Sequence, residues 1–286
     1  MASIRPCFAL VLGFLLSGGC SSDGTINPQA MEMLGAIDPR LRSGSKEMTA
    51  VSGALEFWSA ANLSDAEAKQ IGEATAVAIV NQPEFRLSSD DRLNAYVTKV
   101  GLTIAAVSPR TDIDYTFGVL ESASANAFSM PGGYIFVTRG ALSRMQDESE
   151  LAGVLAHEVA HICLEHGKTI LKDSKMLQGL GKMATADERA AQFRSVVKDF
   201  ANEVVTKAFN PEKELAADRE AIRYVRLAGY DPGGLARYLS RVSTGGTSAG
   251  FFRTHPITSE RLSRIQGLAG GASGAVLKER FAAHVR

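Results

Sequence analysis

Two histidines and a glutamate occur within five consecutive residues, His157-Glu158-Val159-Ala160-His161. At about 100° per residue in a helix, His157 and His161 project from one face about one turn apart, and Glu158 lies in the same sector. Two imidazoles at this spacing can bind one metal ion from one side, and the adjacent carboxylate can take a proton from a metal-bound water. This H-E-x-x-H spacing is typical of zinc hydrolase helices. The alternative is a chance pattern in which both histidines are hydrogen-bonded core residues.

The flanking residues predict the helix that carries this pattern. Asp147 followed by Glu150 is typical of a capping box at a helix N-terminus, and Gly167 is a natural helix end. Residues 151–163 between them are almost all apolar, which predicts a helix buried on nearly every side. The two histidines and the glutamate would then lie in the core, where unpaired polar groups are costly.

A second pair of candidate residues lies about 55 positions further on, at Glu214 and Asp218. Asn210 and Pro211 suit the cap and first position of a helix, on which the two acids share one face. Like charges at this spacing repel slightly, but a metal ion and its histidine ligand would make the arrangement favourable. We therefore expect Glu214 to be a third metal ligand and Asp218 to accept the remaining N–H of His157. The alternative is two solvated acids on a surface helix.

The rest of the chain predicts a mainly helical α+β fold. Helices are expected at residues 64–80, which begin with a Ser64–Glu67 capping box, and at residues 90–106, where apolar residues recur at helical spacing. Residues 168–209 are helical in character but interrupted by glycines and polar residues. They could form a hinged lid over a cleft or a plain helical hairpin. A final helix is expected at residues 259–268.

The small sheet is predicted where the helical spacing of apolar residues gives way to strand-like stretches. Residues 113–120 and 133–138 are rich in β-branched and aromatic side chains and are expected to be strands. Between them, residues 126–133 contain a proline and two glycines, which suit an edge strand and a tight turn. Such an edge could bind an extended peptide by strand addition. An ordinary hairpin is the alternative.

The N-terminus has the features of an export signal. A basic residue, a short apolar run and small residues precede Cys20, and the run is too short for a membrane span. We expect a signal peptide at residues 1–19, lipidation of Cys20 and a tether at 20–44, with signal cleavage without lipidation as the alternative. The domain that contains the H-E-x-x-H helix would occupy residues 45–268, followed by a less ordered tail at 269–286.

Charge and cysteine content narrow the class of protein further. The 286 residues contain 31 basic and 31 acidic side chains, so no basic surface for nucleic acid is expected. Of the three cysteines, Cys7 would leave with the signal and Cys20 would carry lipid, so only Cys163 remains. The fold is therefore expected to hold without disulfides.

Four motifs in one order resemble a known family. They are His157-Glu158-x-x-His161, Glu214-x-x-x-Asp218, Asn126-Ala-Phe-x-x-Pro-Gly-Gly and Thr254-His255-Pro256. Together they resemble the HtpX and CAAX-prenyl-protease family of gluzincins, catalogued as metallopeptidase family forty-eight, over residues 64–268.

The resemblance implies a zincin-like domain in which His157, His161 and Glu214 hold one Zn²⁺. It also implies that Asn126 on the edge strand faces the substrate. Glu158 would be the general base, and His255 would either stabilise the oxyanion or occupy the fourth zinc position in a latent state. His166 matches a histidine often found one turn past the motif, and we expect it to have a structural role at the helix C-terminus.

The implied function is a zinc-dependent metalloendopeptidase. The absence of further apolar spans makes the chain similar to the exported branch of the family, lipoproteins on the periplasmic face of the envelope, here expected at the outer membrane. Its substrates would be unfolded or misassembled envelope proteins. The rival class is a chaperone-like assembly factor with a structural zinc site.

Overall fold

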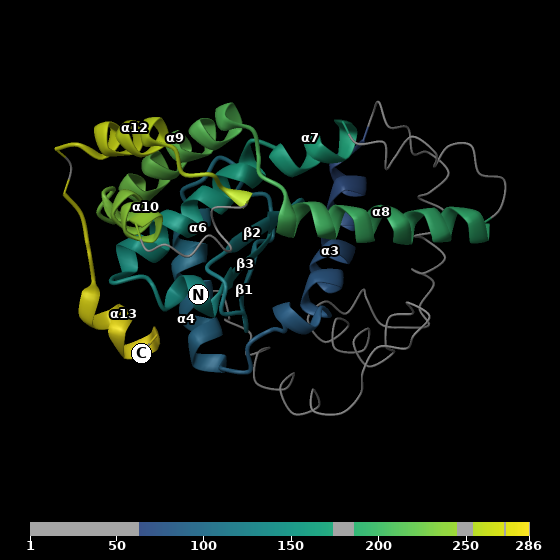
Figure 1. Cartoon of the computed structure of the whole chain (residues 1–286), viewed down its shortest axis with the longest axis horizontal. Helices are drawn as coiled ribbons and strands as arrows, with labels where there is room; N and C mark the ends of the chain where they lie inside the picture. The colour runs from purple at the N-terminus through teal and green to yellow at the C-terminus, as the bar shows by residue number, and fades with distance from the viewer. Residues whose placement is uncertain (1–62, 174–185, 245–253, 272, 286) are drawn as a thin grey trace.

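The computed structural model describes residues 63–173, 186–244, 254–271 and 273–285. These residues form a three-stranded sheet packed between helices on both faces (Figure 1). The elements are α3 (Asp65–Val80), η3 (Pro83–Phe85), α4 (Asp91–Ala105), β1 (Thr116–Leu120), β2 (Ala127–Met130), β3 (Tyr134–Thr138), α5 (Arg139–Leu142), α6 (Glu148–Cys163), α7 (His166–Asp173), α8 (Ala186–Thr206), α9 (Pro211–Leu227), α10 (Gly234–Thr244), α12 (Ser259–Ala269) and α13 (Lys278–Val285). The predicted mainly helical α+β class is confirmed.

The sheet has the strand order β1-β3-β2, so β2 lies at one edge. β1 pairs with β3 in parallel, and β2 pairs with β3 in antiparallel fashion through a tight turn. Gly132 and Gly133 in this turn have φ values of +88° and +100°, a region that side chains with a Cβ rarely adopt. The predicted strands, edge position and turn are therefore present, although β1 begins three residues later than expected.

The helix α6 runs through the centre of the molecule. The side chain of Asp147 accepts a hydrogen bond from the backbone N–H of Glu150, as predicted. The return half of the capping box differs, because the Glu150 carboxylate accepts from the N–H of Gln146 instead. The helix ends at Cys163, four residues before the expected Gly167, and Glu165 adopts a positive φ of 55°. His166 consequently begins α7 and does not lie at the end of α6, so that part of the prediction was wrong.

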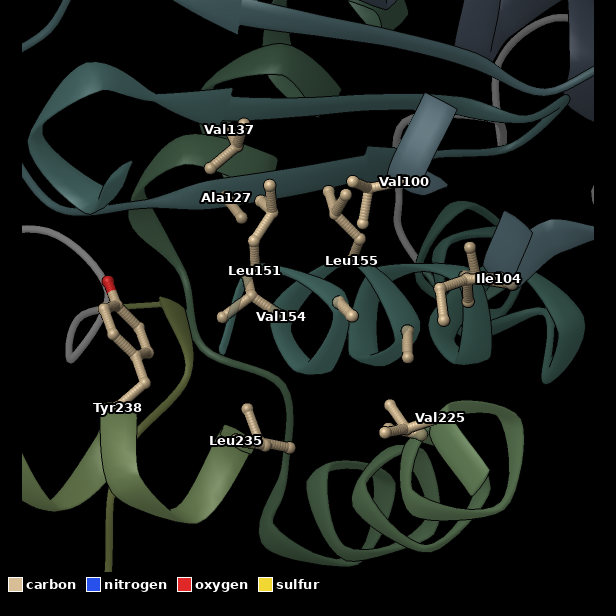
Figure 2. Close-up of a cluster of buried hydrophobic side chains, with 14 of the residues drawn as sticks. Val100, Ile104, Ala127, Val137, Leu151, Val154, Leu155, Val225, Leu235 and Tyr238 are labelled. Atoms are coloured by element: carbon tan, nitrogen blue, oxygen red, sulfur yellow. The ribbon is translucent and has the colours of Figure 1, made fainter. Parts of the chain in front are cut away.

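Apolar side chains fix the position of α6 on both sides. Figure 2 shows Leu151 and Leu155 pointing toward the sheet, where Ala127 lies, while Leu235 and Val225 lie on the opposite side of the helix. All five are at most 1% exposed. At about 25 cal/mol per Å² of buried apolar surface, each large side chain here stabilises the fold by roughly 1.5–3 kcal/mol. A helix held so firmly from two sides is a rigid base for polar side chains.

The approach of α10 to α6 depends on one glycine. A Cβ at Gly153 would lie 2.9 Å from the backbone nitrogen of Leu235, closer than real Cβ atoms come to such an atom. The missing side chain therefore lets the two helices touch through their backbones.

The other face of the sheet is covered by α3 and α8. The Ser64–Glu67 capping box is present, and α3 ends at Val80 as predicted. Phe128 and Phe136 on this face belong to the same apolar cluster as Ala201 of α8. Figure 1 shows α8 running beside α3. Residues 174–185 lie outside the described residues, and a lid role for 168–209 stays a prediction.

The C-terminal segment is folded, contrary to the expectation of a less ordered tail. The helix α13 buries Phe281 completely, and Arg280 forms a two-pronged ion pair with Glu148 at the start of α6. The Glu148 carboxylate also accepts hydrogen bonds from the hydroxyls of Tyr96 at 2.8 Å and Tyr230 at 2.6 Å. The sequence did not predict this because Phe281 and Arg280 stand in a mostly polar stretch that shows no helical periodicity of apolar residues.

The predicted signal peptide, Cys20 and tether all lie outside the described residues, which begin at residue 63. Within the described part of the chain, every helix is too short or too polar to cross a bilayer.

Candidate metal centre

The side chains of His157, Glu158 and His161 project from α6 into the interior. Each is at most 1% exposed. The Nε2 atoms of the two histidines lie 2.9 Å apart, and their rings meet nearly edge to face. The helical spacing thus brings both nitrogens to one point, as the motif predicts.

The helix α9 supplies the acidic side of the centre. Asn210 caps it, Pro211 is its first residue, and Glu214 and Asp218 lie buried on the face that packs against α6. The Glu214 carboxylate lies 3.4 Å from the Nε2 atoms of both His157 and His161. Asp218 Oδ1 lies 3.0 Å from His157 Nδ1, which is the contact expected from the sequence.

His255 completes the cluster from the segment before α12. Its Nδ1 atom lies 3.2 Å from His157 Nε2 and 3.1 Å from Glu214 Oε1, and its Nε2 atom lies 3.3 Å from Glu158 Oε1. One donor atom from each of His157, His161, Glu214 and His255 lies within 4.8 Å of all the others. Three imidazole nitrogens and one carboxylate, buried and convergent, form a donor set that suits Zn²⁺. The residues therefore fit the metal that the motif implies.

Burial and charge set the protonation of this cluster in its metal-free state. Burial opposes the charged form of His157, but hydrogen bonds to Asp218 and Glu214 outweigh it and raise its pKa to about 9. Burial, helped by the charge of His157, holds the pKa of His161 well below its usual value. Burial would raise the pKa of Glu214, but the nearby His255 and Arg261 lower it well below the ordinary value. At neutral pH the imidazole of His161 is therefore neutral and the carboxylate of Glu214 is ionised, so both groups can bind a cation.

Arg261 is a residue of the centre that the sequence did not reveal. It lies on α12, is 2% exposed, and forms an ion pair of 2.6 Å with Glu214 Oε2. It also holds Asp218 with two hydrogen bonds, from Nε at 2.6 Å and Nη2 at 2.9 Å. One guanidinium thus fixes both acids of α9.

The edge strand approaches the centre from the other side. Ser129 of β2 donates a hydrogen bond of 2.7 Å to Glu158 Oε2. Asn126, predicted to face substrate, accepts a hydrogen bond from Thr254 through its Oδ1 atom and also holds the N–H of Ala127. Asn126 is therefore buried beside the centre, close to the segment that carries His255. Ser129 was missed because a serine in a strand carries no motif.

Two further side chains contact His161. The Nδ1 atom of His166 lies 2.8 Å from that of His161, and the ring of Phe209 stacks on His161 at 4.2 Å. Burial, with the charge of Lys213, lowers the pKa of His166 to about 4, so His166 is neutral near pH 7. A neutral imidazole at this place can fix the tautomer of His161.

A buried histidine–glutamate centre on a helix beside an edge strand defines a metal-dependent peptidase. The sequence signature described as "Peptidase family M48" matches residues 90–269, and the chain belongs to this family. It is accordingly a metalloendopeptidase, a hydrolase of peptide bonds. The narrower HtpX and CAAX-type resemblance stays a prediction.

Several similar proteins have names that describe a protease. The chain is 27% identical to metalloprotease YcaL of Escherichia coli over 76% of this chain and 85% of YcaL. It is 28% identical to mitochondrial metalloendopeptidase OMA1 of Schizosaccharomyces pombe, over 60% of this chain and 51% of that protein. The beta-barrel assembly-enhancing protease of E. coli is 24% identical over 64% of this chain, which spans 40% of that protein. These names favour the enzyme over the assembly-factor alternative.

Proposed function

We propose that the protein is a zinc endopeptidase of the bacterial cell envelope. The observation that carries the proposal is the convergence of His157, His161, Glu214 and His255 within 4.8 Å, with the Glu158 carboxylate beside them. Bound there, zinc would act as a Lewis acid on the scissile carbonyl and lower the pKa of a coordinated water.

Glu158 has the position of a general base. Ser129 holds its Oε2 atom, whereas its Oε1 atom has no hydrogen-bond partner within the described chain and faces His255. A buried carboxylate oxygen without a hydrogen-bond partner costs stability, and a catalytic role is one explanation for its presence in a folded protein. We infer that Oε1 accepts the proton of the attacking water and later delivers it to the leaving amine.

His255 would act either on the oxyanion or as a fourth ligand that keeps the enzyme latent. The contact of its Nδ1 atom with Glu214, at 3.1 Å, supports the second state in this structure. Asp218 would fix the tautomer of His157, and Asn126 would bind the substrate backbone at the edge of β2.

The test is hydrolysis of an unfolded protein such as casein by the zinc-loaded enzyme and four variants. Glu158→Gln should retain zinc and lose at least about 100-fold in turnover. The exposed Glu84→Gln is the matched control and should behave as wild type. Wild-type cleavage by Glu158→Gln would rule out its role as base. His255→Ala should cleave faster than wild type if the enzyme is latent, and slower if His255 serves the oxyanion. Asn126→Ala should raise KM more than it lowers kcat.

We propose the domain plan and location from the N-terminal sequence. Residues 1–19 would be a signal peptide, Cys20 a lipid-bearing residue, 20–44 a tether and 45–268 the peptidase domain. The protein would then sit on the periplasmic face, at the outer membrane. Incorporation of labelled fatty acid that Cys20→Ala abolishes would support this plan, and unchanged labelling would refute it.

The substrates that fit this location are unfolded or misassembled envelope proteins. The name of the beta-barrel assembly-enhancing relatives supports this class, since it refers to a process on envelope proteins. This substrate class can be tested by comparing the envelope proteins that accumulate in cells with the wild-type enzyme and in cells with Glu158→Gln.

A further inference from the structure

A cavity of about 250 Å³ opens beside the metal centre. It lies between the N-terminal end of α3, the β2–β3 turn and the junction of α6 with α7, and Ser129 and His161, which are both buried, are among the residues that line it. Ser129 holds the general base, so a substrate strand on the edge of β2 would place a side chain into this cavity. The volume suits one long side chain.

Part of the cavity lining is apolar. Ile113, Met130, Pro131 and Ile162 line it, and they could pack against the methylene groups of a substrate side chain. Lysine and arginine bury their stems along such surfaces while their charged ends stay near water.

The mouth of the cavity carries an ion-pair network in which three carboxylates share two cations. Arg110 lies 3.0 Å from Asp112, 3.9 Å from Asp65 and 3.7 Å from Glu165. Lys168 contacts Asp65 and lies 3.6 Å from Glu165. The side chain of Lys168 is 13% exposed and that of Arg110 is 28% exposed, whereas the three acids are 42–65% exposed. The negative groups are thus the outer ones.

The remaining charges of the wall keep the balance negative. Asp114 and Lys69 also line the cavity, so it has four carboxylates against three cationic side chains. The stem of Lys69 lies against Gly132 at the turn. The hydrogen bond from Lys168 lowers the pKa of Asp65, and that from Arg110 lowers the pKa of Asp112, so both acids are ionised near neutral pH.

We propose that this cavity is a specificity subsite that takes a lysine or arginine side chain of the substrate next to the scissile bond. The proposal rests on the peptidase function and narrows its substrate class to chains with a basic residue at that place. The apolar wall holds the stem, and the outer carboxylates meet the cationic end. An acidic side chain would instead meet four carboxylates, and two of the three cations, Arg110 and Lys168, already have carboxylate partners.

The experiment compares peptides that differ at one position. Cleavage sites in unfolded casein are first mapped with zinc-loaded enzyme, and a matched peptide series then places Arg, Leu or Glu at each of three positions on either side of the bond. At one position, kcat/KM for Arg should exceed that for Glu by roughly tenfold, the effect of two exposed ion pairs. Raising the salt concentration to about 0.5 M should reduce this ratio, because exposed charges are then screened.

A double variant, Asp112→Asn with Asp114→Asn, tests the residues themselves. It removes two carboxylates and leaves Arg110 with one partner fewer, so the Arg-to-Glu ratio should fall to about one or below. Asp91→Asn, which removes an exposed acid outside the cavity, should leave the ratio unchanged. A ratio near one in the wild type, a preference for Glu, or a preference that survives the double variant would overturn the proposal.

Failure of this subsite is distinguishable from failure of the peptidase. If the wild type cleaves casein without a basic preference, only the subsite is refuted. If neither the wild type nor His255→Ala cleaves casein, the peptidase proposal fails. The subsite is then measured by fluorescence anisotropy of labelled unstructured peptides that carry Arg, Leu or Glu at their centre, on the zinc-loaded wild-type protein. Equal affinity for Arg and Glu peptides in that measurement would refute the subsite as well.

Discussion

Replacement of Arg261 by methionine should expose how strongly this one side chain holds the centre together. Arg261 is 2% exposed and pairs with both Glu214 and Asp218. Removing one member of a buried ion pair costs about 3–5 kcal/mol, because the partner stays buried without its counter-charge. Two carboxylates lose their cation here, so we expect the metal-free variant to lie in the upper half of this range.

Urea or thermal unfolding of the metal-free protein would measure this effect. For a domain of this size, about 1 kcal/mol shifts Tm by about 2–4 °C, so Tm should fall by at least about 8 °C. The control is Arg264→Met on the same helix, whose ion pair with Glu260 is mostly exposed and whose loss should change the free energy of unfolding by less than about 0.5 kcal/mol.

Zinc provides a second check on the reasoning. The metal would give Glu214 a new counter-charge, so the destabilisation by Arg261→Met should shrink when zinc is saturating. If Arg261→Met and Arg264→Met unfold at the same denaturant concentration without metal, the arginine does not hold the two acids, and the argument is wrong.

Three further predictions concern the ligand set, the start of α6 and the packing of α10. Glu214→Ala should weaken zinc binding by more than the roughly 100-fold that is lost when a hydrogen-bond partner of a metal ligand is removed. The exposed Glu212→Ala is the control and should bind zinc like the wild type. Chelator competition measures both affinities, and equal values would remove Glu214 from the site. Burial raises the pKa of Glu148, but hydrogen bonds led by that of Arg280 outweigh it and lower the pKa, so its stabilisation is present above the unfolded value of 4.5 and fades as pH falls through the folded value. Glu148→Gln should therefore be less stable than wild type at pH 7, and the gap should close under acid; a gap independent of pH in urea unfolding would contradict this. Gly153→Val should destabilise by about 3 kcal/mol or more, because its Cβ would meet the backbone of α10, and a wild-type Tm would show that the helices can separate.

The sequence predicts those parts of the centre that depend on local spacing. His157 and His161 share a helix face because they are four residues apart, and Glu214 and Asp218 do so for the same reason. Arg261 was not predicted because its role depends on how α12 crosses α9, which no local pattern encodes. The network around Glu148 was missed for the same reason, since its partners come from three distant segments.

Errors at the end of α6 have a different physical origin. Glycine is the usual residue at a positive φ, and Gly167 was therefore the expected end. Glu165 takes this conformation instead, and its carboxylate lies 3.7 Å from Arg110 and 3.6 Å from Lys168. Tertiary ion pairs of this kind can offset the small cost of a strained backbone. One of the two partners, Arg110, is 55 positions away along the chain, so local sequence alone does not encode this contact.

The contacts that complete the centre join residues far apart in the chain. His157 meets His255 across 98 residues and Arg261 across 104, and Glu148 meets Arg280 across 132. During synthesis, α6 emerges from the ribosome long before any of these partners. Its two histidines and its glutamate can reach their final environment only after Arg261 has left the exit tunnel, and its first turn only after Arg280 has done so. A nascent chain therefore carries the peptidase motif without an assembled centre until the segment through Arg261 has been made.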